Sequence, residues 1–317
     1  MNKKNRKSNS FFFKYLFNYY YLLKFFIIFT FIVCLAYNFD DLKSALKFRP
    51  EKNKRIFSFW EPIRKIPGYI HLCIKTWKKF LPEYEINILD YRSVKYYLGE
   101  NIFSNIICKN MPLPIQADAI RIALLKKFGG IWMDPDTIIT NGEFLRNIEN
   151  YKLVMIGEND TQHVGFIFAS NDSKIINNWF KEIIERVKNF KKSEQISKIR
   201  GRVKWNFLGN GIIDKLLKKN RNKNELFRLD KYQLNAFPEI NFFANSTLNL
   251  FQRYIQFYFK KGEPKVILEN IKGIIMLHNS WTPKKYKKMN EDEFCREDIV
   301  LSKLLVKILN INILFSI

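Results

Sequence analysis

The sequence predicts an α/β fold with a central, mostly parallel sheet flanked by helices. Two observations carry this prediction: a strand–helix–strand pattern over residues 55–90, and a helix followed by glycines and a short apolar strand over residues 114–133. Strand, helix and strand at this spacing form a βαβ unit, in which the two strands pair in parallel. The chain has 317 residues and 47% hydrophobic content, which is ample for a large core.

The first unit has clear boundaries. Arg55 to Trp60 alternates as a strand, and the following Glu-Pro pair ends it. A helix follows Pro67-Gly68 and runs through Phe80, and Tyr84 to Asp90 forms the second strand, with apolar residues alternating. We expect Tyr91 to Cys108 to contribute a further helix.

The second unit carries two acids. Apolar residues recur at helical spacing before Gly129-Gly130, which stop the helix. Ile131 to Met133 is too short for a helix and is expected to be a strand. This strand delivers Asp134 and Asp136 to its carboxyl end, where open α/β sheets place their ligands.

Asp134 and Asp136 flank one proline. Pro135 ends the strand ladder, so both acids can turn toward one cavity. Two anions held close together raise a pKa unless a cation lies between them, and a hard divalent cation such as Mg²⁺ or Mn²⁺ relieves the repulsion. The alternative is an Asp-Pro-Asp surface turn with no metal.

Asp118 and Arg121 are three residues apart and are expected to share a helix face distinct from the apolar one. One interpretation is a surface ion pair. The other is a carboxylate and a guanidinium that bind sugar hydroxyls and an anion.

These residues together resemble the signature of glycosyltransferases with a DXD sugar-binding motif, the family 32-like enzymes that include the capsular polysaccharide synthesis proteins. The matching positions are Gln116, Asp118, Arg121, Leu125, Gly129-Gly130 and Asp134-Pro135-Asp136. Weaker similarity extends from about Arg55 to Trp281. The resemblance implies a GT-A-type nucleotide-diphospho-sugar transferase fold.

The resemblance also implies the chemistry and its residues. The donor would be a nucleoside-diphosphate sugar, UDP- or GDP-linked, used with Mn²⁺ or Mg²⁺, and the acceptor a glycan or a lipid-linked glycan. The transfer would retain the anomeric configuration. The implied catalytic residues are Asp118, Arg121, Asp134 and Asp136; the implied metal ligands are Asp134, Asp136 and His278; and the implied donor-binding residues are Phe59, Trp60, Asp118, Arg121, Asp134, Ser280 and Trp281.

Some of these residues have plainer interpretations. Trp60 can be a core residue, and His278 and Trp281 can be an exposed histidine and a partly buried tryptophan. A polar loop, 158–163, would border the acceptor pocket, although its histidine can simply be solvated. Glycines in the segment 207–211 can present N–H groups to phosphate, but relatives often carry proline where this chain has Asn210.

The remaining elements follow from composition. Strands are expected at 152–157, 165–169 and 274–277, helices at 175–190 and 212–218, and a charged connection at 191–202. The segment 137–140 can continue the strand before it or lead into the next element.

Five segments are predicted: a basic tail (1–24), a membrane anchor (25–39), a charged linker (40–54), the glycosyltransferase domain (55–298) and an apolar helix (299–317) that is either core or membrane-interfacial. The stretch 25–39 is uncharged and, with the residues before it, approaches the ~20 residues of a spanning helix. A cleaved signal peptide is the alternative. The sequence therefore predicts a membrane-associated protein, with the side of the catalytic domain left open.

The net charge of +24 indicates anionic partners: nucleic acid, an anionic membrane or phosphate-bearing substrates. The basic residues are not concentrated in one element and no base-reading motif is present, so no nucleic-acid partner is expected. The alternative functions are a membrane-tethered nucleic-acid-binding or non-catalytic domain, and a DxD phosphatase. The four cysteines are scattered and predict neither a disulfide framework nor a zinc site.

Overall fold

The computed structural model describes residues 54–158, 161–197, 203–219, 225–264 and 270–312, all within the compact unit Pro50–Ile317. The predicted basic tail, membrane anchor and nearly all of the linker lie outside the described residues. Within the described part of the chain, no helix combines the length and apolar character needed to cross a membrane.

A six-stranded sheet forms the centre, in the order β2-β1-β3-β6-β5-β7. β1 pairs in parallel with β2 and β3, β5 pairs in parallel with β7, and β6 is antiparallel to both β3 and β5. The prediction of a mostly parallel sheet is confirmed, with β6 as the antiparallel insertion. The strands are β1 (Arg55–Phe59), β2 (Glu85–Leu89), β3 (Gly130–Met133), β5 (Leu153–Glu158), β6 (Thr161–Ala169) and β7 (Leu226–Asp230).

The predicted βαβ unit is present. Helix α2 (Gly68–Phe80) connects β1 to β2, and the two strands pair in register from Arg55 opposite Glu85 to Phe59 opposite Leu89. This arrangement brings the carboxyl ends of β1 and β2 to one edge of the sheet.

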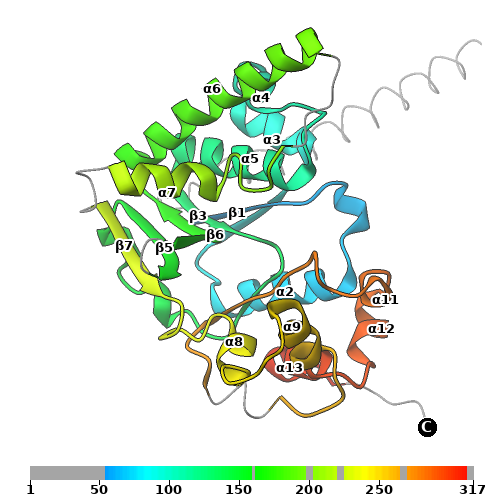
Figure 1. The fold of residues 1–317 in the computed structure, drawn as a ribbon. Coiled ribbons are helices and arrows are strands. Elements are labelled where there is room, and N and C mark those ends of the chain that lie inside the picture. The colour runs from blue at the N-terminus through cyan, green and yellow to red at the C-terminus, as the bar shows by residue number, and fades with distance from the viewer. Residues whose placement is uncertain (1–53, 159–160, 198–202, 220–224, 265–269, 313–317) are drawn as a thin grey trace, which may run out of the picture. The chain divides into compact units, whose positions relative to one another are not determined.

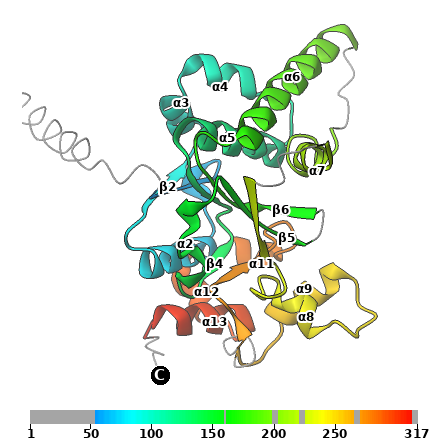
Figure 2. The ribbon, with the colours of Figure 1, turned by 90° about the vertical axis from the view of Figure 1, so that its left-hand side faces the viewer.

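Helices cover both faces of the sheet (Figures 1 and 2). One face carries α3 (Tyr91–Leu98), α4 (Glu100–Ile106), α5 (Leu113–Phe128), α6 (Lys174–Ser197) and α7 (Asn210–Lys219). The other carries α2, α8 (Pro238–Phe242), α9 (Leu250–Tyr258), α11 (Lys284–Lys287), α12 (Glu291–Cys295) and α13 (Val300–Leu309), with a two-stranded sheet of β4 (Thr137–Ile139) and β8 (Ile274–Met276). Alternate strand residues supply the two cores: Ile131 and Met133 join one cluster, and Trp132 joins the other.

Two predicted boundaries are wrong. The segment 91–108 forms two helices rather than one, because Gly99 adopts φ 83° between α3 and α4, a conformation that ends a helix. The predicted charged connection from 191 is helical as far as Ser197, since α6 continues beyond its apolar stretch.

The predicted polar loop is also shorter than expected. β5 and β6 form an antiparallel hairpin in which Glu158 pairs with Thr161, so His163 lies within a strand. The segment after the two acids turns away from the main sheet: β4 pairs with β8 instead, with Thr137 opposite Met276.

The C-terminal apolar helix packs into the core. In α13, Leu301, Leu304 and Leu305 are fully buried in the cluster that also contains residues of α2. A membrane-interfacial helix would keep an apolar face for lipid, whereas this face is already covered by protein. The apolar face of residues 300–309 is thus packed against protein.

We predict that Gly130→Ala destabilises the fold more than Gly99→Ala. Both glycines have positive φ, 95° and 83°, but a Cβ at Gly130 would lie 2.7 Å from the Arg55 carbonyl oxygen, whereas the space at Gly99 is open. Backbone strain alone costs about 1–3 kcal/mol, and the clash with β1 adds to it. Chemical denaturation measures the difference, with Gly262→Ala, which has neither problem, as the control. Equal losses for Gly130→Ala and Gly99→Ala would contradict the close approach of the two strands.

Candidate active site

The largest group of predicted site residues lines one cavity of about 550 Å³, a volume typical of ligand pockets. It lies where β1 and β3 end, between these strand ends, the start of α5 and the segment after β8. The predicted residues that line it are Phe59, Trp60, Asp118, Arg121, Asp134, Asp136, His278 and Ser280. These residues come from four separate parts of the chain.

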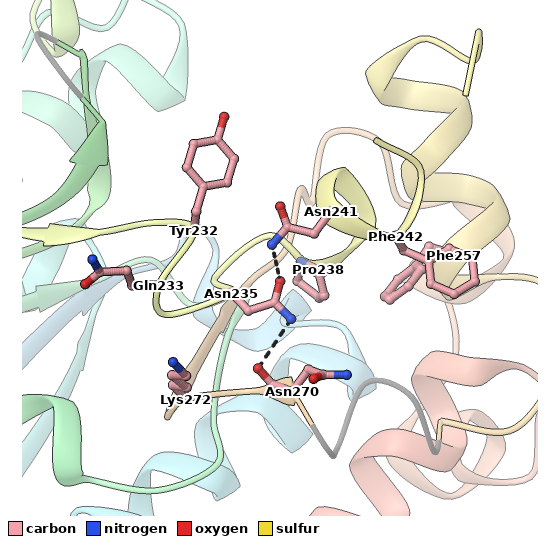
Figure 3. Close-up of a pocket in the computed structure, with 9 residues that line it drawn as sticks. All are labelled: Tyr232, Gln233, Asn235, Pro238, Asn241, Phe242, Phe257, Asn270 and Lys272. Atoms are coloured by element: carbon pink, nitrogen blue, oxygen red, sulfur yellow. Dashed lines mark hydrogen bonds between the residues drawn. The ribbon is translucent and has the colours of Figure 1, made fainter. Parts of the chain in front are cut away.

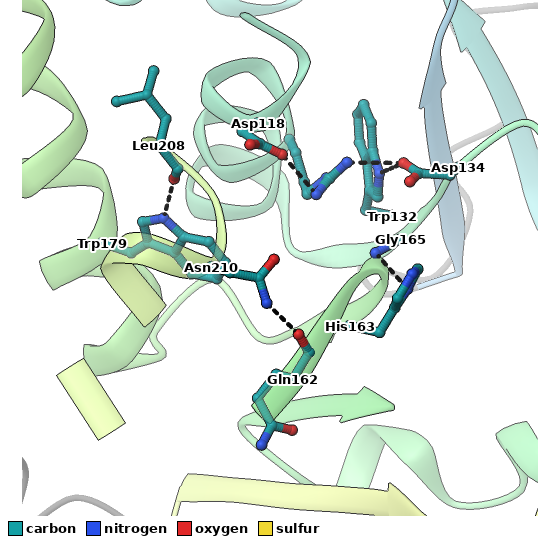
Figure 4. Close-up of polar contacts among 10 residues, drawn as sticks. Asp118, Trp132, Asp134, Gln162, His163, Gly165, Trp179, Leu208 and Asn210 are labelled. Atoms are coloured by element: carbon teal, nitrogen blue, oxygen red, sulfur yellow. Dashed lines mark hydrogen bonds and ion pairs between the residues drawn. The ribbon is translucent and has the colours of Figure 1, made fainter. Parts of the chain in front are cut away.

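Arg121 lies at the centre of a buried charge cluster. Its Nη1 is 2.9 Å from Asp118 Oδ1 and its Nη2 is 2.8 Å from Asp134 Oδ1 (Figure 4). The Arg121 side chain is only 4% exposed, whereas that of Asp134 is 32% exposed. Of the two interpretations of this pair, the structure excludes the surface ion pair, because α5 is covered on nearly all sides and Asp118 and Arg121 are both buried.

Asp134 is held from a second direction. The indole N–H of Trp132 donates to Asp134 Oδ1 at 2.8 Å, and the Arg121 guanidinium lies 4.9 Å from the Trp132 ring centroid (Figure 4). Positions 132 and 134 are two apart along an extended segment and can therefore share one side of it. That spacing is the signal in the sequence that could have identified Trp132.

Gly209 lies against Asp118. A Cβ at Gly209 would lie 2.5 Å from Asp118 Oδ2, so a larger residue there would displace the Asp118 carboxylate. A glycine before α7 thus has a structural explanation: it lets the backbone at Gly209 lie close to the carboxylate of Asp118. The phosphate-binding role predicted for its N–H groups stays a prediction, and Asn210 donates its side-chain amide to the Gln162 carbonyl oxygen (Figure 4).

Asp136 is positioned by the second sheet. The pairing of β4 with β8 places the amide N–H of Asn279 2.7 Å from Asp136 Oδ2, and the Leu277 N–H donates to the Asp136 carbonyl oxygen. The Asn279 side chain in turn accepts a hydrogen bond from the Tyr69 hydroxyl at 2.5 Å. Asn279 and Tyr69 were not identified from the sequence, because their role depends on the long-range pairing of β4 with β8.

Burial and mutual repulsion dominate the electrostatics. Burial raises the pKa of Asp118 to about 7 although Arg121 opposes the shift. Burial and then the neighbouring Asp134 carboxylate raise the pKa of Asp136 to about 7. The Asn279 hydrogen bond only partly offsets that rise. Repulsion from Asp134 thus adds to the effect of burial on the pKa of Asp136.

Two histidines line the same cavity in the neutral form, since burial lowers the pKa of both His163 and His278 to about 4. His163 Nδ1 accepts the Gly165 N–H at 3.2 Å, which leaves the proton on Nε2. His278 stacks near Phe237 and lies 4.1 Å from Trp281 between ring centroids. Sequence reasoning placed His163 in a solvated loop, whereas the β5–β6 hairpin buries it.

Asp134 and Asp136 each have one carboxylate oxygen that accepts hydrogen bonds from protein donors. Asp134 Oδ1 and Asp136 Oδ2 are used by protein donors, so each group keeps a second oxygen for a ligand. Within the described residues no group of three His, Cys, Asp or Glu side chains could hold a metal ion. His278 Nε2 lies 3.8 Å from Glu239 Oε1 instead, so its metal role stays a prediction.

The chain can now be compared with known proteins. A sequence profile of capsular polysaccharide synthesis proteins matches residues 36–199, just over half of the chain. The chain belongs to the capsular polysaccharide synthesis protein family. The family predicted from the sequence, that of glycosyltransferases of the capsule-synthesis type, is thereby confirmed. Comparison with curated proteins finds no match.

Solved structures of glycosyltransferases are distantly similar. The apo form of GlyE from Streptococcus pneumoniae TIGR4 matches with 12% identity over 83% of this chain and 61% of that chain, with a TM-score of 0.39. The PaToxG glycosyltransferase matches with 19% identity over 60% and 77% of the two chains, TM-score 0.34. A glycosyltransferase involved in glycosylation of the major capsid of PBCV-1 matches with 12% identity over 74% and 96%, TM-score 0.34. The chain spans about 61% of the GlyE chain, and the family assignment rests on the sequence match alone.

We predict that Trp132→Phe lowers sugar transfer about tenfold to a hundredfold. The substitution keeps the buried ring but removes the hydrogen bond to the Asp134 carboxylate, and such a bond to a charged group contributes about 1.5–3 kcal/mol. The matched control is Trp179→Phe, which removes an indole hydrogen bond to the Leu208 carbonyl oxygen at 2.8 Å. Initial rates and melting temperatures are compared; equal loss of activity in both variants would contradict a specific role for Trp132.

Proposed function

We propose that the chain is a metal-dependent glycosyltransferase of the GT-A type. It transfers a sugar from a nucleoside-diphosphate donor, UDP- or GDP-linked, to a glycan or lipid-linked acceptor at a membrane. The observation that carries this proposal is the cluster of Asp118, Arg121, Asp134 and Asp136 on one cavity at the carboxyl ends of parallel strands.

The donor is expected to lie along this cavity. Phe59 and Trp60, at the end of β1, border it and supply an aromatic surface for the nucleotide base. Ser280, after β8, borders the part near Asp136 and can donate to a phosphate oxygen. Trp281 does not line this cavity but a neighbouring one, so its predicted contact with the diphosphate depends on movement of the segment 278–281.

Asp134 and Asp136 would hold the cation, because hard divalent cations take carboxylate oxygens and both groups converge on the cavity. When bound, Mn²⁺ or Mg²⁺ neutralises charge on the departing diphosphate. Arg121 keeps Asp134 in place through a short ion pair, and its buried Nε–H has no acceptor among the described residues.

Asp118 and Arg121 would bind the donor sugar. Asp118 accepts hydrogen bonds from hydroxyls, and Arg121 supplies positive charge where negative charge develops. Because the pair is buried and already formed, little reorganisation is needed during the reaction. The residues do not include an obvious covalent nucleophile, and retention of the anomeric configuration is the outcome that the family resemblance implies.

The direct test is a donor screen. The full-length chain is incubated with Mn²⁺ and the common UDP- and GDP-sugars, and release of the nucleoside diphosphate is measured. We expect release from one donor, abolished by excess EDTA and by Asp136→Ala or Asp134→Ala in folded protein. Full activity in EDTA would refute the metal role, and no release from any donor by folded protein would favour a non-catalytic domain.

We predict that Arg121→Lys lowers transfer by about a hundredfold or more. A lysine ammonium is a point charge and cannot pair with Asp118 and Asp134 in the geometry of the guanidinium fork. The matched control is Arg186→Lys, which alters a similar pair, with Glu182 at 2.9 Å, on α6. Steady-state rates and melting temperatures of the two variants are compared. Near wild-type activity of Arg121→Lys would contradict the need for a guanidinium that pairs with both carboxylates.

A further inference from the structure

A second cavity adjoins the first. It has a volume of about 210 Å³. It shares Gln162, His163 and His278 with the first cavity, which contains Asp118, Arg121, Asp134 and Asp136 and is called the donor cavity below. It is smaller than the roughly 300–1,000 Å³ typical of ligand pockets, so it suits one ring rather than a chain. A third cavity, around Asn235 and Asn241, is shown in Figure 3. It shares no lining residue with either the second cavity or the donor cavity.

Glu239 is the unusual residue of this cavity. Its side chain is 2% exposed, and Oε1 has no hydrogen-bond partner among the described residues. Oε2 accepts a hydrogen bond from the Tyr258 hydroxyl at 3.3 Å. His278 Nε2, at 3.8 Å, is too far from Oε1 for a hydrogen bond. A buried carboxyl oxygen without a donor is costly, which indicates that a ligand supplies the donor.

The rest of the lining mixes apolar and polar side chains. Trp281, Ile240 and Phe237 line the cavity, and Leu250 borders it with 51% of its surface exposed. The polar lining residues include Lys231, which is paired with Glu158 at 2.7 Å. A carboxyl group beside aromatic and aliphatic side chains suits a sugar ring, which offers hydroxyl donors at its edge and C–H groups on its faces.

We propose that this second cavity binds one sugar ring of the acceptor, with Glu239 accepting a hydrogen bond from a ring hydroxyl and Trp281 covering part of the ring. The acceptor role rests on the proposed function, because it places the ring next to the donor cavity. His163 and His278 line both cavities and therefore lie between the two ligands.

The test uses full-length protein and the methyl glycosides of glucose, galactose, mannose and N-acetylglucosamine as probes. Binding is measured by saturation-transfer NMR, and binding of UDP and GDP with Mn²⁺ is measured separately. Two variants alter the cavity: Glu239→Gln removes the charge of the acceptor while keeping its size, and Ile240→Trp fills the space. The matched controls are Glu297→Gln, at an exposed ion pair, and Gln233→Trp, in the cavity of Figure 3.

We expect wild-type protein to bind at least one methyl glycoside. Glu239→Gln should weaken this binding about threefold to tenfold, as for the loss of one ordinary hydrogen bond. Ile240→Trp should abolish it, and both controls should bind as wild type does. Nucleotide binding should be the same in all four variants, and melting temperatures identify any variant that fails to fold.

Three results would overturn the proposal: no glycoside binds wild-type protein, binding survives in folded Ile240→Trp, or Glu239→Gln weakens nucleotide binding as much as glycoside binding. Failure of the proposed function has a different signature. In that case no nucleotide binds, while the glycoside still binds and still depends on Glu239.

Discussion

The structure of the site depends on one buried arginine held between two carboxylates. Arg121 pairs with Asp118 on its own helix and with Asp134 at the end of β3, so it ties α5 to the central sheet. Burying a charge is costly unless it is paired and hydrogen-bonded. The fold meets this requirement with two anions, an aromatic ring and a glycine that allows Asp118 to lie close to α7. Asp118, Arg121, Trp132 and Asp134 also border the cavity, so the groups that stabilise the buried charge are the ones a ligand there would meet.

The second acid of the DXD motif is placed differently. Asp136 precedes β4, whose pairing with β8 brings the Asn279 amide to its carboxylate. Because Asp134 belongs to the main sheet and Asp136 to the small one, the distance between the two acids depends on how the two sheets pack. This arrangement also explains why the segment after β8, far away in sequence, lies beside the acids.

Several elements of the site could be predicted from the sequence. The helix before the glycine pair, the short strand and the two acids each have local signals: periodicity, glycine and proline. Their convergence on one cavity was also expected, since parallel strands end at one edge of a sheet. The family resemblance supplied Phe59 and Ser280, which line the same cavity.

Other residues were missed for physical reasons. For the polar face of α5 the sequence left a surface ion pair and a binding pair both open, because periodicity does not show which helices are covered on all sides. His163 was assigned to a loop because its neighbours are polar, whereas strand pairing with β5 buries it. Glu239 has no motif around it; only packing shows that its Oε1 lies without a donor.

The central claim is that Asp134 and Asp136 together bind a divalent cation beside Arg121. Anomalous diffraction from crystals grown with Mn²⁺ and a nucleoside diphosphate tests it most directly. The predicted result is one manganese peak in contact with a carboxylate oxygen of both acids, with Arg121 still paired to Asp118 and Asp134. A nucleotide bound in this cavity without manganese at the two acids, or manganese bound elsewhere, would contradict the claim.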